Sequence, residues 1–75
     1  MKFTDLKQGN IYDNITDLAI PLMYTGNFKD TSTDIKTIQC EFKPIKTDKN
    51  KNWFDAKKVY HFNFRGENLE NPIIR

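Results

Sequence analysis

The chain has 75 residues and a formal net charge of +2, and charged residues of both signs make up 29% of it. A chain of this length forms one domain, residues 1–75, with room for one small hydrophobic core. Mixed charges together with 13% aromatic residues argue against a disordered chain. The apolar run 19–24 is far too short to span a membrane. The composition therefore predicts a single small globular domain.

Cys40 is the only cysteine, so no disulfide can form within the chain, which favours a reducing compartment. The N-terminal segment 1–10 has no apolar run behind its first lysine, so we expect no signal peptide. These features predict a cytoplasmic protein. Lysine outnumbers arginine 10 to 2 and only two alanines are present, a bias that AT-rich codons produce. We therefore expect the gene to come from a bacteriophage or an AT-rich bacterium.

The first predicted element is one helical turn within residues 3–8, with Thr4 as its cap. The dipeptide Gly9-Asn10 is a turn signal that ends it. Residues 11–15 alternate poorly between apolar and polar side chains, and we interpret them as a short first strand.

A clearer strand is predicted at Ala19–Tyr24, closed by a turn at Gly26-Asn27. Pro21 lies inside it and has no N–H to donate to a ladder, so this strand should lie at a sheet edge, or the ladder should break there. Residues 29–34 hold no apolar side chain and predict an exposed loop.

A β-hairpin is the strongest prediction, because two runs alternate apolar and polar residues with a period of two. The apolar members are Ile38, Cys40 and Phe42 in the first run, and Tyr60, Phe62 and Phe64 in the second. The polar segment 46–52 separates the runs. Pairing Cys40 with Phe62 puts three apolar cross-strand pairs on one face and places Glu41 opposite His61 on the other.

After the hairpin, residues 65–68 predict a turn, and 71–75 predict a short final edge strand in which Pro72 is tolerated. Five short strands joined by tight turns indicate an all-β fold. We predict a small five-stranded, SH3-like, partly open barrel built on the central hairpin. An oligonucleotide-binding barrel and a small α+β sheet are the alternatives.

Catalysis is not indicated by the residue types present. A Cys40–His61 pair is the candidate nucleophile and base, but the predicted register puts the two side chains on opposite faces. One cysteine and one histidine cannot make a structural zinc site, and Asp30 and Asp34 lack the ordered ligand set of a calcium loop. The glycines are isolated, so no phosphate-binding loop is present. We expect no enzyme activity, no metal and no cofactor.

Positive charge is concentrated on the hairpin. Residues 36–65 carry a net charge of +5, whereas residues 1–35 carry −2. Trp53 and Phe54 lie within this basic segment, and in an extended chain one of the two must point outward. The candidate partner-binding residues are Lys46, Lys49, Lys51, Trp53, Lys57, Lys58 and His61.

We therefore predict a non-enzymatic binding module, a phage-type accessory or host-modulating protein that acts through protein–protein interaction. One alternative is single-stranded nucleic-acid binding, with bases stacked on Trp53, Tyr60 or His61 and phosphates near the lysines. Another is that the lysines only maintain solubility and protect the sheet edge. A homo-oligomer through the edge strand containing Pro21 and Met23 is a further predicted association.

Overall fold

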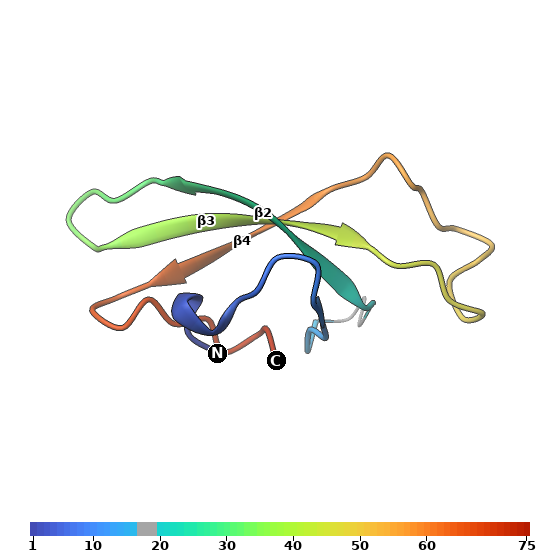
Figure 1. Ribbon diagram of the computed structural model, residues 1–75, viewed down its shortest axis with the longest axis horizontal. Helices are drawn as coiled ribbons and strands as arrows, with labels where there is room; N and C mark the ends of the chain where they lie inside the picture. The colour runs from blue at the N-terminus through green and yellow to red at the C-terminus, as the bar shows by residue number, and fades with distance from the viewer. Residues whose placement is uncertain (17–19) are drawn as a thin grey trace.

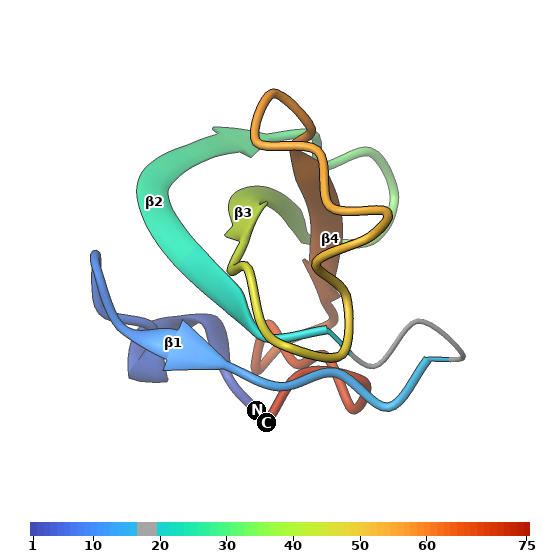
Figure 2. The same cartoon turned by 90° about the vertical axis from the view of Figure 1, so that its right-hand side faces the viewer.

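The computed structural model describes residues 1–16 and 20–75, which form one elongated body of 41 × 20 × 19 Å. Within these residues an antiparallel sheet of four strands, in the order β1-β2-β3-β4, curls into a half-barrel (Figures 1 and 2). The elements are the 3-10 helix η1 (Phe3–Asp5) and the strands β1 (Ile11–Tyr12), β2 (Leu22–Asp30), β3 (Thr37–Pro44) and β4 (Tyr60–Arg65). The predicted all-β class is confirmed.

The short helix η1 differs in detail from the predicted one. It begins after Lys2, which makes no side-chain cap, so the cap predicted at Thr4 is wrong. With three helical residues in the described parts of the chain, the α+β alternative has no support. None of the helical structure described is long and apolar enough to cross a membrane.

The predicted hairpin and its register are confirmed. Cys40 lies opposite Phe62, and Glu41 lies opposite His61, with no irregularity along the β3–β4 ladder. The pairs Ile38–Phe64 and Phe42–Tyr60 complete the apolar face. This register is favoured because a slip by one residue would turn the whole apolar set toward solvent.

The core lies on the concave face of the curled sheet. Phe42 and Phe64 are fully buried there, and the ring of Phe42 packs edge-on against Phe62 at 5.7 Å between centroids. Residues from outside the hairpin close the core from β1, from the start of β2 and from the C-terminal segment. The other buried apolar residues are Tyr12, Ile20, Leu22, Tyr24, Cys40, Leu69 and Ile74.

Strand β2 is longer than the predicted strand Ala19–Tyr24, whose first residue lies outside the described residues. The predicted turn at Gly26-Asn27 is wrong, because the strand continues through these residues to Asp30. Gly26 has a φ of +88° and sits in a bulge, where the register shifts so that residues 25–27 face the single residue Glu41. Residues 29 and 30, the first two of the predicted loop 29–34, therefore belong to β2.

The edge position predicted for the strand containing Pro21 and Met23 is also wrong. Strand β2 pairs with β1 on one side and with β3 on the other. Pro21 lies just before the first residue of β2, where its missing N–H breaks no ladder, and its carbonyl accepts a hydrogen bond from the Ile45 N–H at 3.0 Å. The edges of the described sheet are β1 and β4, so a homo-oligomer through Pro21 and Met23 has no free edge to use.

The C-terminal segment closes one end of the half-barrel without forming the predicted fifth strand. Ile74 makes an isolated bridge with Asn14, and Glu70 makes isolated bridges with both Arg65 and Lys2. The two chain ends consequently lie side by side (Figures 1 and 2). The five-stranded, SH3-like detail is thus not confirmed, because bridges take the place of a strand in this part of the described chain.

The buried position of Phe42 predicts a large loss of stability when its side chain is removed. Replacing it with alanine should destabilise the protein by about 3–5 kcal/mol, since the change leaves a cavity that the curled sheet cannot fill. That is a large share of the stability of about 4–11 kcal/mol expected for a domain of this length. Urea unfolding followed by far-ultraviolet circular dichroism measures the loss.

Phe28→Ala is the matched control, because Phe28 is 58% exposed and its ring packs on Phe3 rather than in the buried core. We expect it to cost about 1 kcal/mol or less. Equal losses in Phe42→Ala and Phe28→Ala would contradict the assignment of the core.

Candidate functional site

The connection between β3 and β4 is an ordered loop built around one buried polar residue, Asn50, whose exposed fraction is 1%. The Asn50 side-chain oxygen accepts a hydrogen bond from the Thr47 N–H at 2.8 Å, and its amide nitrogen donates to the Ile45 carbonyl at 3.1 Å. The Thr47 hydroxyl accepts in return from the Asn50 N–H at 3.3 Å. A buried amide that is satisfied in this way holds the backbone in one conformation.

This loop presents Trp53 to solvent. The Trp53 N–H donates to the Asn50 carbonyl at 3.0 Å, which turns the chain directly after the buried residue. The indole is 54% exposed, whereas neighbouring Phe54 is half-buried. The sequence left open whether Trp53 is buried, and the structure places it at the surface.

A groove of about 570 Å³ lies between this loop and the segment that leads into β2. Ile20 is buried at its floor and Pro21 is half-buried beside it. The hydrogen bond from the Ile45 N–H to the Pro21 carbonyl fixes the two walls against each other. The lining residues are Ile20, Pro21, Thr47, Asp48, Lys49, Asn50 and Trp53. An apolar floor, an indole on one wall and a polar rim suit the uptake of an apolar side chain.

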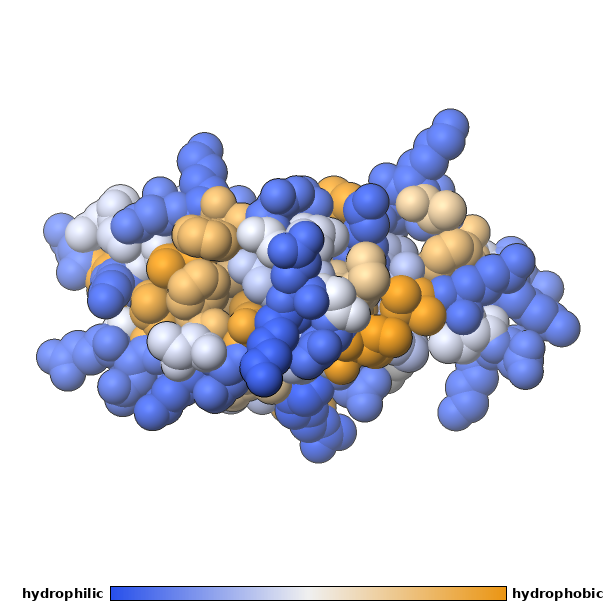
Figure 3. All heavy atoms as spheres, viewed as in Figure 1, coloured by the Kyte–Doolittle hydropathy of each residue, from blue (hydrophilic) through white to orange (hydrophobic). Residues whose placement is uncertain are grey.

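The loop carries five lysines against two aspartates. All five are exposed, and none has a carboxylate partner within 4.0 Å among residues 1–16 and 20–75. Figure 3 places hydrophilic side chains projecting from the end of the molecule where Figure 1 draws the β3–β4 connection. Lys58 lies 5.0 Å from the centre of the Tyr60 ring, close enough for a cation–π contact. The lysines are Lys46, Lys49, Lys51, Lys57 and Lys58.

His61 is not part of this group. It follows Tyr60 on β4, so the two side chains point to opposite faces of the sheet. The His61 Nε2 lies 3.9 Å from a carboxylate oxygen of Glu41, as the cross-strand register predicted. Of the seven predicted binding residues, the structure therefore groups six on one loop and sets His61 apart.

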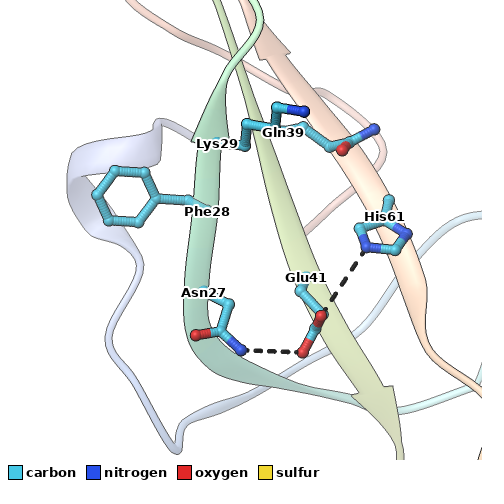
Figure 4. Close-up of a pocket in the computed structure, with 6 residues that line it drawn as sticks. All are labelled: Asn27, Phe28, Lys29, Gln39, Glu41 and His61. Carbon is cyan, nitrogen blue, oxygen red and sulfur yellow. Dashed lines mark hydrogen bonds and ion pairs between the residues drawn. The ribbon is translucent and has the colours of Figure 1, made fainter.

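Glu41 and His61 belong to a second, smaller hollow of about 180 Å³ on the outer face (Figure 4). The other Glu41 carboxylate oxygen accepts hydrogen bonds from the Asn27 amide at 3.2 Å and from the Thr25 hydroxyl at 3.1 Å. Phe28 points away from this cluster in Figure 4. These contacts join β3 to the bulge in β2. The cluster of Thr25, Asn27 and Glu41 therefore stabilises the bulge.

The Cys40–His61 pair does not come together. Cys40 is fully buried on the concave face, while His61 is exposed on the convex face. Burial raises the pKa of the Cys40 thiol from its ordinary value of 9.0 to about 11, so the thiol is protonated near neutral pH. Cys40 accordingly lacks both the neighbour and the thiolate that a nucleophilic cysteine needs. In the described part of the chain, no group of three or more His, Cys, Asp or Glu side chains lies close enough to hold a metal ion.

Comparison of this chain with protein-family models, with curated proteins and with solved structures gives no significant match.

The buried thiol generates a prediction on reactivity and pH. Native Cys40 should resist alkylation by iodoacetamide at pH 8 and react fully once the chain is unfolded. Above pH 9 the unfolded chain loses the thiol proton before the folded chain does, so stability should fall as the pH rises from 9 to about 11.

Cys40→Ala should abolish the part of this fall that begins near pH 9. A later loss remains, because burial also raises the pKa of Tyr24 to about 12. A native thiol that reacts rapidly at pH 8 would contradict the buried position.

The role of Asn50 is tested by Asn50→Ala. The change leaves the Thr47 N–H and the Ile45 carbonyl without their partner, which should destabilise the loop by about 1–3 kcal/mol. Amide hydrogen exchange measured by nuclear magnetic resonance should become faster throughout residues 45–54. Asn52→Ala is the matched control, since Asn52 is exposed. Unchanged loop exchange in Asn50→Ala would contradict the proposed role.

Proposed function

We propose that this protein is a non-enzymatic binding module that captures a partner protein through the groove beside Trp53. The partner would contribute an acidic segment with one apolar side chain that enters the groove. One observation carries the proposal: a half-exposed indole stands over an apolar floor, on an ordered loop whose lysines have no carboxylate partner among the described residues.

Energetics support this assignment of roles. Tryptophan is the residue type most enriched among interface hot spots, and one that is already held by an ordered loop loses little freedom on binding. The lysines would act mainly on the rate of encounter, because exposed charges steer an oppositely charged partner more than they tighten the complex. In this proposal Trp53 supplies affinity and the lysines supply the preference for acidic segments.

Single-stranded nucleic acid is the competing ligand, because Trp53 lies among the lysines. Nonspecific binders of this kind stack successive bases on several rings along one groove. Here Tyr60 and His61 point to opposite faces, and His61 lines a different hollow from Trp53. With one free ring in the basic loop, a protein segment fits better than a strand of bases.

We further propose a cytoplasmic setting and a phage-type accessory or host-modulating role. The support for both is compositional: one unpaired cysteine and a lysine-rich, alanine-poor chain.

The proposal is tested by calorimetric titration with three probes at low salt. The first is a nonapeptide of glutamates with a central leucine, the second replaces that leucine with serine, and the third is a single-stranded DNA of equal charge. We expect the leucine peptide to bind most tightly. Trp53→Ala should weaken that binding by about 2 kcal/mol, on the order of thirtyfold.

Ile35→Ala is the control variant, because Ile35 is 58% exposed in the β2–β3 connection and does not line the groove. Its binding should equal that of the unmodified protein. Equal affinity for the leucine and serine peptides would contradict the groove as the anchor site. Tighter binding of DNA, with a steep loss as salt is added, would instead establish the nucleic-acid function.

A further inference from the structure

Strand β4 has one neighbour in the described sheet, β3, so its other side is an edge. In an antiparallel strand, successive residues send their N–H and C=O groups alternately to the two sides. Arg65 identifies which residues face the edge. Its N–H donates to the Glu70 carbonyl at 3.0 Å, and its carbonyl accepts from the Glu70 N–H at 2.9 Å, so both groups point away from β3.

The ladder between β3 and β4 runs without irregularity from Tyr60 to Arg65, so His61 and Asn63 share the direction of Arg65. The Asn63 carbonyl confirms this, because it accepts the side-chain amide of Asn71 at 2.8 Å. Three backbone groups remain: the N–H and C=O of His61 and the N–H of Asn63. Among residues 1–16 and 20–75, none of these three groups has a hydrogen-bond partner.

These groups face a groove of about 440 Å³. One wall is β4, and the other is the segment 70–73, which leaves the strand at the Glu70 bridge. We propose that this open stretch of β4 takes up an extended peptide as an additional strand of the sheet. The donors at His61 and Asn63 are two residues apart, about 7 Å along a strand, which is the repeat of another extended chain.

The geometry also defines what the peptide should carry. Phe62 is half-buried and lies on the concave side of the edge, between two residues that point to the convex side. An apolar side chain opposite Phe62 would cover its ring, while polar side chains would lie beside His61 and Asn63. Residues 70–73 form the facing wall of this groove, so the occupant must lie between that wall and β4, which favours an extended peptide over the sheet edge of a second folded copy.

Proteins usually protect such an edge with lysine, proline or a bulge. Residues 60–64 have none of these, and their aromatic side chains favour strand formation. At the other edge, β1 covers only Leu22 and Met23 of β2, and the rest of β2 carries the bulge at Gly26 and Lys29. The unprotected edge is therefore β4, which faces the groove between this strand and residues 70–73.

The probe is a blocked heptapeptide of alternating valine and threonine, titrated to millimolar concentration into the isotopically labelled protein. We expect the amide resonances of His61 and Asn63 to shift, and their fast hydrogen exchange to become slow. Asn63→Pro removes the edge-facing N–H, a group that makes no hydrogen bond to β3, so it should weaken binding at least tenfold. Asn63→Ala keeps that N–H and should bind like the unmodified protein.

The same peptide with alternate amides methylated gives a comparison that needs no protein variant, should Asn63→Pro fail to fold. It should bind at least tenfold more weakly. Shifts confined to other residues, or equal binding by Asn63→Pro and Asn63→Ala, would overturn the proposal. So would a dimer that forms without peptide and protects the His61 and Asn63 amides, because the edge would then belong to a second copy.

Discussion

The register between β3 and β4 is the constraint on which the rest of the structure depends. It places Phe42 and Phe64 on the same face of the sheet, in the core. Because side chains alternate along β3, Glu41 lies on the convex face, where its carboxylate binds the bulge in β2. It also decides which backbone groups of β4 face away from the sheet. A slip of one residue would turn the apolar side chains of β4 toward solvent and reverse which of its backbone groups face the edge. The core and the open edge are thus consequences of one pairing.

The hairpin was predictable because its information is local. Each run alternates over six residues, and one choice of register puts every apolar member on the same face of the sheet. Strand β2 was not predictable in the same way. Gly26-Asn27 has the composition of a turn, but it is a bulge here because Glu41, which is distant in sequence, binds both Thr25 and Asn27. The edge assignment failed because Pro21 lies just before the ladder, so its missing N–H does not require an edge, and only the fold shows that β1 pairs with the other side of β2.

For the candidate site, composition located the basic loop and its tryptophan but not the groove. The floor of the groove comes from Ile20 and Pro21, which only the fold brings to the loop. Asn50 also went unrecognised, since it lies in a polar run with nothing to mark it as buried. The spacing of Thr47 and Asn50 is typical of side chains that bond to nearby backbone, and was the one available signal. The open edge of β4 could not be inferred until the order of the strands was known.

The two proposed surfaces differ in how closely they are tied to the fold. The loop is held by bonds among Ile45, Thr47 and Asn50, all within six residues, so Trp53 and the lysines can change without disturbing the core. The edge of β4, in contrast, alternates with the core along the same strand: Phe62 lies between His61 and Asn63. Its geometry is therefore as fixed as the register, and only its outward side chains can vary. In a small domain of this kind, substitutions in the loop can change which partner binds there, while the backbone hydrogen-bonding groups at the β4 edge stay the same.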